Sequence, residues 1–414
     1  MRQVTALPPE AATLRSRHIG IDARYLKRAG IGISWYLHRG ICELLSAQAR
    51  VTLLTDDAAH GAALLAAYPP ASVIVLPGRS GFIWEQWTLR RHLASSGYDG
   101  FIAPANYGLP LAYRGPTRLI LVVHDLIPLR LPHLYLLPRP LWSAKYLLSI
   151  AIAAARADHI VAVSQATARD VARLLRRPVA GVVYPPIPRP ASAQPGDQIA
   201  APAAAGRQTH TPQPHTLETA SPAGGRDGSG SMYQFPERYF VYNGGTDVRK
   251  NVPMLLRAFA RVRPTLPGAD LVIIGAGYEC FRREIGRLGI AGQVHLPGYV
   301  DDAAKTAILA NALALVYPSR LEGFGLPVVE AFAAGIPVIS GTGGSLREVG
   351  GSAATYVEPL DERSLAAAMA TVAGQDGHQR AVSAGTAQLE LLWERRQAAT
   401  FARTVASCLP SRAT

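Results

Sequence analysis

The chain has 414 residues, more than one ordinary hydrophobic core holds and enough for two domains of typical size. Hydrophobic residues make up 49% of it, as expected for an α/β protein with well-buried strands. The formal net charge of +13 is compatible with nucleic acid, anionic lipid or a phosphorylated substrate as partner. No zinc finger, aromatic RNA-binding stretch or basic zipper accompanies this charge, so the sequence argues against nucleic acid.

Strands and helices alternate through the first half of the chain. Strands are expected where Val, Ile and Leu run together, at residues 18–26, 50–55, 72–77, 118–125 and 159–164. A helix is expected at 32–47, and another follows Ser164, which is placed to cap it. Short apolar runs between helices predict a parallel sheet covered on both faces. We expect residues 1–185 to form the first domain.

The longest apolar stretch, residues 141–155, contains Lys145 and is followed by Arg156. It is too short and too charged to span a bilayer, so it predicts a buried or interfacial helix. The amino-terminal residues lack the apolar segment of a secretory signal. The cysteines are scattered and form no CxxC pair, so the sequence predicts a cytoplasmic protein without disulfides.

A change of composition divides the chain. Residues 186–236 are rich in Ala, Pro, Gly, Ser, Gln and Thr, with few large apolar residues, and predict a disordered linker or insertion. A second alternation follows, with strands expected at 238–245, 270–277, 293–300, 313–319 and 337–340. It predicts a second domain at 237–388. A final helix within 389–414 is expected to pack back toward the first domain.

The positive charge is concentrated in the first half. Residues 1–185 contain 21 Lys and Arg against 10 Asp and Glu, giving +11, whereas residues 186–414 contain 21 against 19, giving +2. This asymmetry leads to the hypothesis that the first domain docks on the inner leaflet of the cytoplasmic membrane, using Arg90, Arg91 and the helix around Lys145. The alternative is that these are scattered, solvated arginines.

One short stretch, RLEGFGLPVVEAFAAG, places two glutamates around a turn rich in glycine and proline. The turn joins the strand ending near residue 319 to a helix expected to start at Pro327. Its free N–H groups and helix dipole make an anion site at the carboxyl end of a parallel strand. Glu322 precedes the turn and Glu330 lies one turn into the helix. Taken singly, each glutamate has a simpler explanation: Glu330 complements the dipole and Glu322 is solvated.

The longer stretch PSRLEGFGLPVVEAFAAGIPVIS resembles the E-x7-E signature of the retaining glycosyltransferases of family 4. GIDARYLKRAGIGISWYL, VVHDLIPLRLP, RADHIVAVSQATARDV and VYNGGTDVRKNVPMLLRAF agree with the same family in order. The resemblance implies the GT-B fold, two Rossmann-like βαβ domains facing a deep cleft. It also implies that Glu322 lies against the donor sugar and that Glu330 binds the ribose hydroxyls. The turn residues Gly323, Phe324, Gly325 and Leu326 would hold the phosphates.

The resemblance assigns further residues to the donor. Lys250 would neutralise the leaving diphosphate with help from Arg249, although the family often has a polar residue where this chain has Gly244. The other residues it assigns are Gly30 and Gly32 facing the diphosphate, His124 at the transferred sugar, and Gly298 and Tyr299 near the base. By themselves, glycines at a strand-to-helix turn and a lone histidine are more often structural.

The predicted chemistry is retaining sugar transfer without a metal or other cofactor, because no D-x-D motif occurs. The stretch IIGAGYEC lacks the third glycine of a dinucleotide fingerprint, so we do not interpret it as a cofactor site. HDLIPLRLP is similar to mannosyltransferases of bacterial surface-polysaccharide assembly, which favours GDP-mannose as donor and a glycan or polyprenyl-diphosphate-linked acceptor. A non-catalytic scaffold and a GT-B sugar-nucleotide epimerase are the alternatives.

Overall fold

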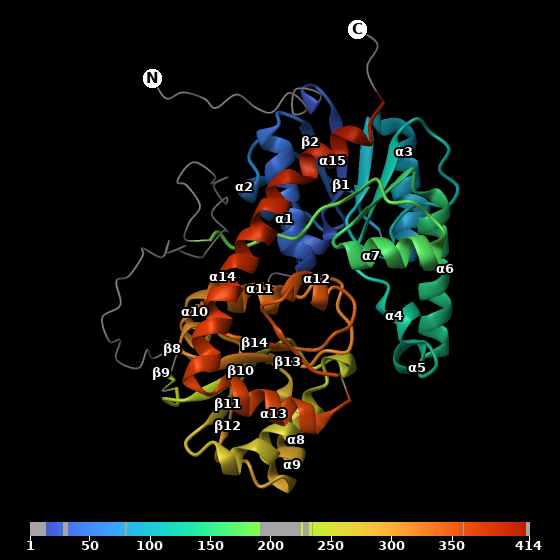
Figure 1. The fold of residues 1–414 in the computed structure, drawn as a ribbon. Coiled ribbons are helices and arrows are strands. Elements are labelled where there is room, and N and C mark those ends of the chain that lie inside the picture. Colours follow the sequence, from blue (N-terminus) through green and yellow to red (C-terminus); the bar gives the residue numbers. More distant parts are fainter. Residues whose placement is uncertain are drawn as a thin grey trace, which may run out of the picture. The chain divides into compact units, whose positions relative to one another are not determined.

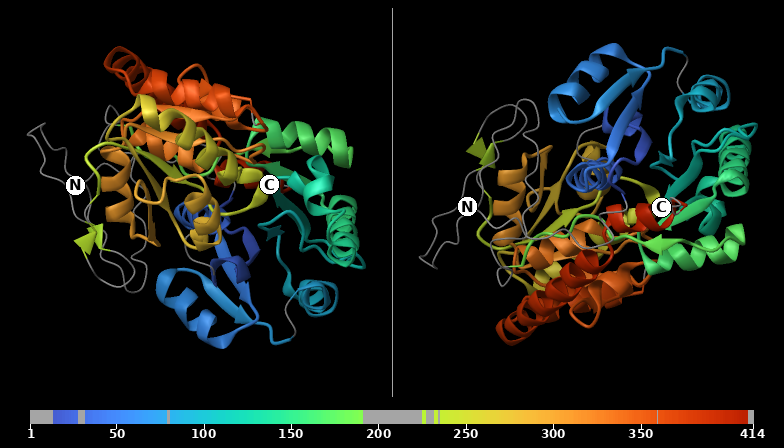
Figure 2. Two further views of the ribbon diagram at one scale, coloured as in Figure 1. Left: turned by 90° about the horizontal axis from the view of Figure 1, so that it is seen from below. Right: turned by 90° about the horizontal axis from the view of Figure 1, so that it is seen from above.

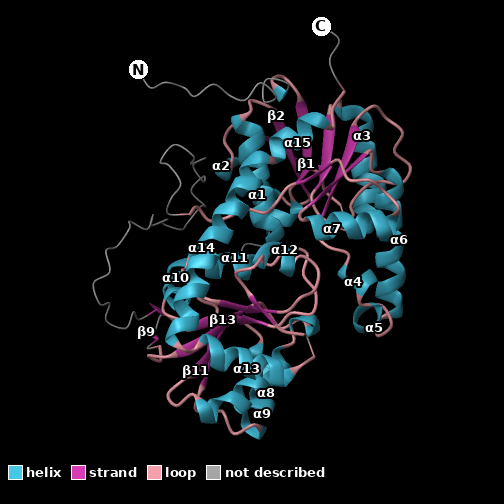
Figure 3. Cartoon of the chain, viewed as in Figure 1, coloured by secondary structure: helices cyan, strands magenta, loops and turns pink. Residues whose placement is uncertain are grey.

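The computed structural model describes residues 14–27, 32–78, 81–190, 225–226, 232–233, 235–358 and 360–410. The chain divides into two compact units, each built around its own sheet (Figures 1 and 3). Unit 1 contains the described residues up to Pro186 and those from Arg395 onward, and unit 2 contains the described residues from Ile187 to Glu394. Helices lie on both faces of each sheet (Figure 2).

The sheet of unit 1 has seven parallel strands in the order β3-β2-β1-β4-β5-β6-β7. The strand order reverses direction between β1 and β4, the point where open α/β sheets bind ligands. The strands are β1 (His18–Asp22), β2 (Arg50–Thr55), β3 (Ser72–Val75), β4 (Gly100–Ala103), β5 (Arg118–Val123), β6 (His159–Ala162) and β7 (Gly181–Val182).

Successive residues of these strands enter opposite cores, which is why their sequences are apolar throughout. In β5, Ile120 packs in one cluster, whereas Leu119 and Leu121 pack in the other. The helices of unit 1 are α1 (Gly32–Ser46), α2 (Ala58–Ala67), α3 (Arg90–Ser96), α4 (Ile127–Arg130), α5 (Pro132–Tyr135), α6 (Pro140–Arg156), α7 (Gln165–Asp170) and α15 (Phe401–Ser407), with shorter turns η2 (Arg24–Lys27), η3 (Trp84–Leu89) and η4 (Val171–Leu175).

The last helix, α15, packs on α1 within unit 1. Gly40 of α1 faces the Phe401 ring, where an added Cβ would lie 2.8 Å from a ring carbon. Glu43 of α1 accepts hydrogen bonds from Arg396 and, at 2.6 Å, from the backbone N–H of Phe401. The boundary between the units therefore falls inside the long helix α14 (Gln375–Ala398).

The sheet of unit 2 has six parallel strands in the order β12-β11-β10-β13-β14-β15, with its reversal between β10 and β13. The strands are β10 (Tyr239–Asn243), β11 (Asp270–Ile274), β12 (Val294–Gly298), β13 (Ala314–Tyr317), β14 (Val338–Ser340) and β15 (Thr355–Tyr356). Its helices are α8 (Val252–Val262), α9 (Arg282–Arg287), α10 (Asp302–Ala310), α11 (Leu326–Ala333), α12 (Leu346–Gly350) and α13 (Glu362–Val372), with turns η5 (Val248–Lys250), η6 (Arg263–Thr265) and η7 (Tyr278–Phe281).

The prediction of two parallel α/β units is confirmed, with local differences. The strand expected at 18–26 ends at Asp22, because residues 24–27 form the turn η2 and Arg24 pairs with the Asp22 carboxylate at 2.7 Å. Ser164 caps α7 as predicted, accepting from the Thr167 N–H, but the α-helix ends at Asp170 and continues as the π-helical turn η4. Strand β4 was not anticipated from the sequence.

The apolar stretch 141–155 lies in α6, and among the described residues no helix has the length and apolar character needed to cross a membrane. Residues 1–13 and most of the expected linker 186–236 lie outside the described residues. The described part of that segment includes β8 (Gly225–Arg226), which pairs antiparallel with β9 (Met232–Tyr233). The linker and domain boundaries remain predictions.

Candidate active site

The turn between β13 and α11 has the geometry expected for an anion site. β13 ends at Tyr317, and Gly325 precedes the helix with φ +102°, a conformation that residues with a side chain rarely adopt. Pro327 lies in the first turn of α11, where its missing N–H removes no helical hydrogen bond. The carboxyl end of a central strand and a helix amino terminus therefore meet here.

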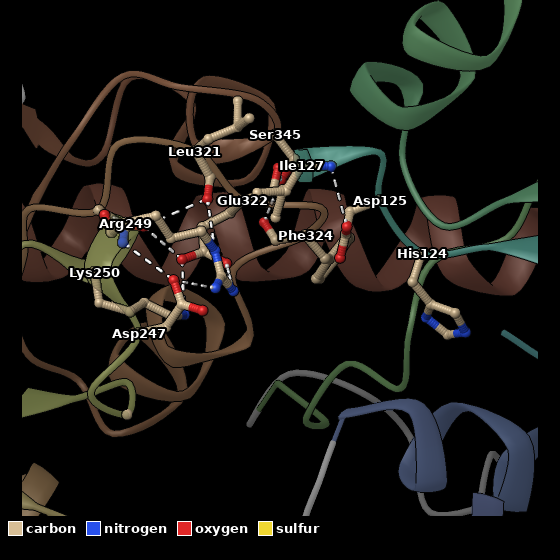
Figure 4. A network of polar contacts seen from close by, with 12 residues as sticks. His124, Asp125, Ile127, Asp247, Arg249, Lys250, Leu321, Glu322, Phe324 and Ser345 are labelled. Atoms are coloured by element: carbon tan, nitrogen blue, oxygen red, sulfur yellow. Dashed lines mark hydrogen bonds and ion pairs between the residues drawn. The ribbon is translucent and has the colours of Figure 1, made fainter. Parts of the chain in front are cut away.

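Glu322 is the centre of a buried polar network at this turn (Figure 4). Its Oε1 lies 2.7 Å from Lys250 Nζ and accepts hydrogen bonds from the hydroxyls of Tyr317 at 2.9 Å and Ser319 at 2.6 Å. Its Oε2 lies 3.5 Å from Arg249 Nη2. The two cations predicted to bind the diphosphate thus contact the predicted donor-sugar carboxylate directly.

In this network, burial and the neighbouring charges shift the pKa values of Glu322 and Lys250 in opposite directions. Burial alone would raise the pKa of Glu322, but Lys250 and Arg249 outweigh it and hold that pKa below its usual range. Burial lowers the pKa of Lys250, and Glu322 opposes that shift only in part. Two cations and two hydroxyl donors face the Glu322 carboxylate, and they keep it ionised.

Lys250 and Arg249 are placed by a short turn after β10. The Asp247 carboxylate accepts from the Arg249 N–H at 3.1 Å and starts η5, while Asn251 ends it with φ +62° and begins α8. The guanidinium of Arg249 also contacts the Asp247 carboxylate at 3.0 Å and the Leu321 carbonyl at 3.2 Å. Arg249 is therefore held both by its own turn, through Asp247, and by the turn that carries Glu322, through Leu321.

Glu330 has its own partners at the neighbouring strand end. Its Oε2 accepts from Asn243 Nδ2 at 3.0 Å, and its Oε1 accepts from Lys305 Nζ at 3.0 Å. Burial would lower the pKa of Lys305, but Glu330 and Asp302 raise it, so Lys305 stays protonated. Gly298 ends β12 with φ +76°, and the next side chain, Tyr299, is 55% exposed.

In unit 1, His124 follows β5 and is held mostly by backbone groups. Its Nε2 lies 2.7 Å from the Pro104 carbonyl, which only accepts, so Nε2 carries the proton and Nδ1 is left as an acceptor. Its backbone N–H donates to Asn106 Oδ1 at 2.8 Å, and its ring makes a T-shaped contact with the Tyr36 ring. Protein atoms surround the ring although part of the residue reaches the surface, and this burial lowers the pKa of His124 to about 4.

The glycine loop expected near the diphosphate is only partly described. Gly32 is exposed and begins α1, whereas Gly30 lies outside the described residues. Among the residues that the structure describes, no group of three or more His, Cys, Asp or Glu side chains is arranged to hold a metal ion.

Two family models match this chain. The model of glycosyl transferases group 1 matches residues 235–387, and that of glycosyltransferase family 4 matches residues 31–189. Together they cover well over half of the sequence, one in each unit. The chain belongs to family 4 of the glycosyltransferases. Its GT-B fold is that of sucrose-phosphate synthase from Thermosynechococcus elongatus, with a TM-score of 0.66 at 18% identity, over 92% of this chain and 96% of that one.

The curated relatives of this family 4 chain are named for the transfer of different sugars. It is 34% identical over 134 residues to O-antigen chain mannosyltransferase B of Escherichia coli, covering 31% of this chain and 35% of the relative. It is 34% identical over 142 residues to a D-rhamnosyltransferase of Pseudomonas aeruginosa, covering 32% and 35%. The chain thus aligns with about a third of the length of each of these relatives.

Three features of the candidate site were not found from the sequence. The first is the loop after β14, where a Cβ on Gly341, Gly343 or Gly344 would lie within 2.2 Å of backbone oxygens of residues 319–322. Only glycine permits this approach, and the Ser345 hydroxyl fixes it by donating to the carbonyls of Glu322 and Phe324. The three glycines directly after a strand were the available signal.

The second feature is a cluster of three tyrosines, two of them in the adjacent strands β10 and β13. Tyr242 stacks on Tyr317 and meets Tyr278 edge to face, and the Tyr278 hydroxyl accepts from the Gly245 N–H at 2.8 Å. A Cβ on Gly244 would lie 2.7 Å from the Tyr242 hydroxyl and 2.8 Å from the Tyr317 ring. This crowding explains why the chain has glycine at that position.

The third feature is Lys305 of α10, the partner of Glu330. Its spacing from Glu330 in the sequence is 25 residues, and no local pattern connects the two. Only the folding of α10 beside α11 brings them together.

Proposed function

We propose that this chain is a metal-independent retaining glycosyltransferase that moves a hexose from a nucleotide diphosphate sugar to an acceptor hydroxyl. The observation that carries the proposal is the buried network in which Glu322 contacts both Lys250 and Arg249 at the amino end of α11. A scaffold without activity has no need to hold two cations against one buried carboxylate.

In the proposed reaction, Lys250 and Arg249 turn from Glu322 toward the diphosphate, and the α11 amino terminus adds its N–H groups. The acceptor oxygen forms the new bond to the anomeric carbon while the bond from that carbon to the diphosphate oxygen breaks. The acceptor proton passes to the departing phosphate oxygen on the same face. Glu322 lies against the donor sugar and stabilises the positive charge that develops there.

The remaining residues position the donor. Glu330, held by Asn243 and Lys305, binds the ribose hydroxyls, and the turn Gly323–Leu326 receives the phosphates. His124, neutral and with Nδ1 as an acceptor, takes a hydrogen bond from a hydroxyl of the transferred sugar. Gly30 and Gly32 face the diphosphate, and Gly298 and Tyr299 lie near the base.

For the substrates we propose GDP-mannose and a glycan or polyprenyl-diphosphate-linked acceptor of polysaccharide assembly, used in the cytoplasm at the inner leaflet. The similarity to a mannosyltransferase supports mannose, and the similarity to a D-rhamnosyltransferase makes a deoxyhexose the alternative to test.

The proposal is tested with the purified full chain and a panel of nucleotide sugars. A donor at a hundred times its dissociation constant should stabilise the protein by about 2.7 kcal/mol, which a thermal shift detects. The stabilising donor should release its nucleotide diphosphate when acceptor glycans are added, in buffer containing EDTA. Donor binding without release on any acceptor would favour a scaffold, and conversion of the donor to an epimer would favour the epimerase.

A further inference from the structure

We propose that unit 1 docks on an anionic lipid bilayer through one defined surface, the α6–η3 face, formed by residues 81–91 around η3 and residues 137–148 leading into α6. The reason for docking, access to a lipid-linked acceptor, rests on the proposed function. The surface itself is argued from its own side chains. Figure 1 shows α6 in unit 1, beside α4 and α5.

Large apolar side chains are concentrated on this face and stay exposed. Leu141 is 89% exposed, Leu137 is 76% and Ile83 is 61%, and the indoles of Trp87 and Trp142 are also exposed. A shallow hollow lined by Phe82, Ala144, Lys145 and Leu148 joins the two segments, so they form one continuous surface. Exposed apolar patches of this kind mark a binding surface, since folding alone does not require them.

The exposed leucines of α6 take no part in the packing of this helix against the core. Tyr146, Ile150 and Ala153 of the same helix pack in the core of unit 1. Leu141 and Leu148 lie on the outer side with Lys145 between them in sequence, all exposed. A helix with a complete buried face and a second apolar face edged by cations has the pattern of a helix that lies in a membrane interface.

The charged side chains that reach the surface of this face are arginines and a lysine. The guanidinium groups of Arg90 and Arg91 lie 5.5 and 4.8 Å from the Trp87 ring centroid, and Arg139 and Lys145 are exposed on the second segment. No Asp or Glu occurs in residues 86–98 or 126–157. Tryptophan ringed by arginine fits a headgroup layer, where the indole reaches the acyl boundary and the cations meet lipid phosphates.

Charge also selects the bilayer over a second copy of this chain. A symmetric contact through the α6–η3 face would bring its arginines close to their own copies, and like charges oppose such an interface. An anionic leaflet supplies the opposite charge over an area of any size. We therefore assign the occupant as anionic lipid, and self-association becomes a result that the test can return.

The experiment is co-sedimentation of the full chain with vesicles of phosphatidylcholine alone or mixed with phosphatidylglycerol, at low and high salt. Binding should require phosphatidylglycerol and fall with salt. Arg90→Glu with Arg91→Glu should lower the partition coefficient by at least about thirtyfold, because each lost cation is worth about fivefold. Leu141→Glu with Leu148→Glu should abolish binding to the mixed vesicles.

Matched controls come from unit 2. Arg282 and Arg283 are a second pair of adjacent arginines, both exposed, and Leu360 is 75% exposed, so their glutamate variants should bind like the wild type. All variants should keep transfer to a soluble acceptor, and Glu322→Gln should still bind vesicles. Binding without transfer by the wild-type chain would remove the proposed function and leave docking intact.

Three results would overturn the proposal. One is equal binding to neutral and mixed vesicles without salt dependence. Another is unchanged binding by the Arg90 and Arg91 double variant. The third is a wild-type dimer in sedimentation equilibrium that Leu141→Glu with Leu148→Glu turns into a monomer, since a second copy would then occupy the α6–η3 face.

Discussion

The candidate residues of the two units are held in different ways. In unit 2, Lys250 and Arg249 both contact Glu322, so the carboxylate and the two cations fix one another's positions. In unit 1, His124 is fixed by a backbone carbonyl, an asparagine amide and a T-shaped contact with an aromatic ring, and burial keeps it neutral. Charge organises the first site, whereas packing organises the second.

This difference determines how each site should respond to change. A network of mutually dependent charges loses much when one member is neutralised, because the others are left buried without a partner. The His124 ring is held by packing and one carbonyl, so replacing it leaves no buried charge without a partner. We therefore expect large effects from unit 2, smaller ones from unit 1, and distinct pH dependences.

The largest effect is expected for Glu322→Gln. Neutralising the carboxylate would remove the proposed charge stabilisation at the donor sugar, and it leaves Lys250 without its 2.7 Å partner, so kcat should fall by about 10² to 10³. The variant should fold, because glutamine has the same shape and can accept from Tyr317 and Ser319. Steady-state kinetics with the identified donor measure the loss, with the exposed Glu358→Gln as control. Near-wild-type turnover would remove Glu322 from the site.

A smaller effect is expected for Tyr317→Phe, which deletes only the hydroxyl between Lys250 and Glu322. A hydrogen bond to a charged group is worth about 1.5–3 kcal/mol, so kcat/KM should fall about tenfold or more. Since that bond favours the ionised carboxylate, its loss raises the pKa of Glu322. The acid limb of the pH–rate profile should then move to higher pH.

The same variant, Tyr317→Phe, should also change how the stability of the fold depends on pH. The folded-state pKa of Glu322 is depressed, so its ionised form stabilises the fold above the ordinary glutamate pKa, and this contribution is lost as the pH falls. Tyr317→Phe should reduce the stability gained between acid and neutral pH in urea titrations. A purely structural role for the hydroxyl would lower stability equally at both and leave the acid limb unmoved.

Replacing His124 by alanine should lower the rate by about tenfold, which corresponds to the loss of one neutral hydrogen bond. With a pKa of about 4, the imidazole is neutral throughout the ordinary assay range, so it should give no limb near neutral pH. Its stabilising contribution is complete above the ordinary histidine pKa and is lost as the pH falls toward 4. A limb near neutrality that disappears in His124→Ala, but not in the exposed His133→Ala, would contradict this geometry.

The sequence was sufficient for the parts of this molecule that local pattern encodes. Apolar runs and caps predicted most of the parallel strands and the Ser164 cap, and the motif around one turn marked Glu322 and Glu330 as candidates. It was insufficient where distant segments meet. Lys305 reaches Glu330 only because α10 folds beside α11, and the 341–345 loop contacts the Glu322 backbone only because β14 pairs with β13. Such contacts depend on tertiary packing, and no local pattern in a single sequence indicates them.

Gly244 gives the last and smallest test, because the sequence marked it only as a departure from the family pattern. A Cβ there would meet the Tyr242 hydroxyl and the Tyr317 ring at 2.7 and 2.8 Å, and both rings are buried and packed against each other. Gly244→Ala should therefore cost about 1–3 kcal/mol of unfolding free energy by overpacking. By displacing Tyr317 it should also lower kcat a few-fold. Gly292→Ala is the matched control, since nothing lies within 4 Å of its added Cβ. If both variants unfold at the same urea concentration as the wild type, the tyrosine cluster does not restrict this position, and the missing polar residue needs another explanation.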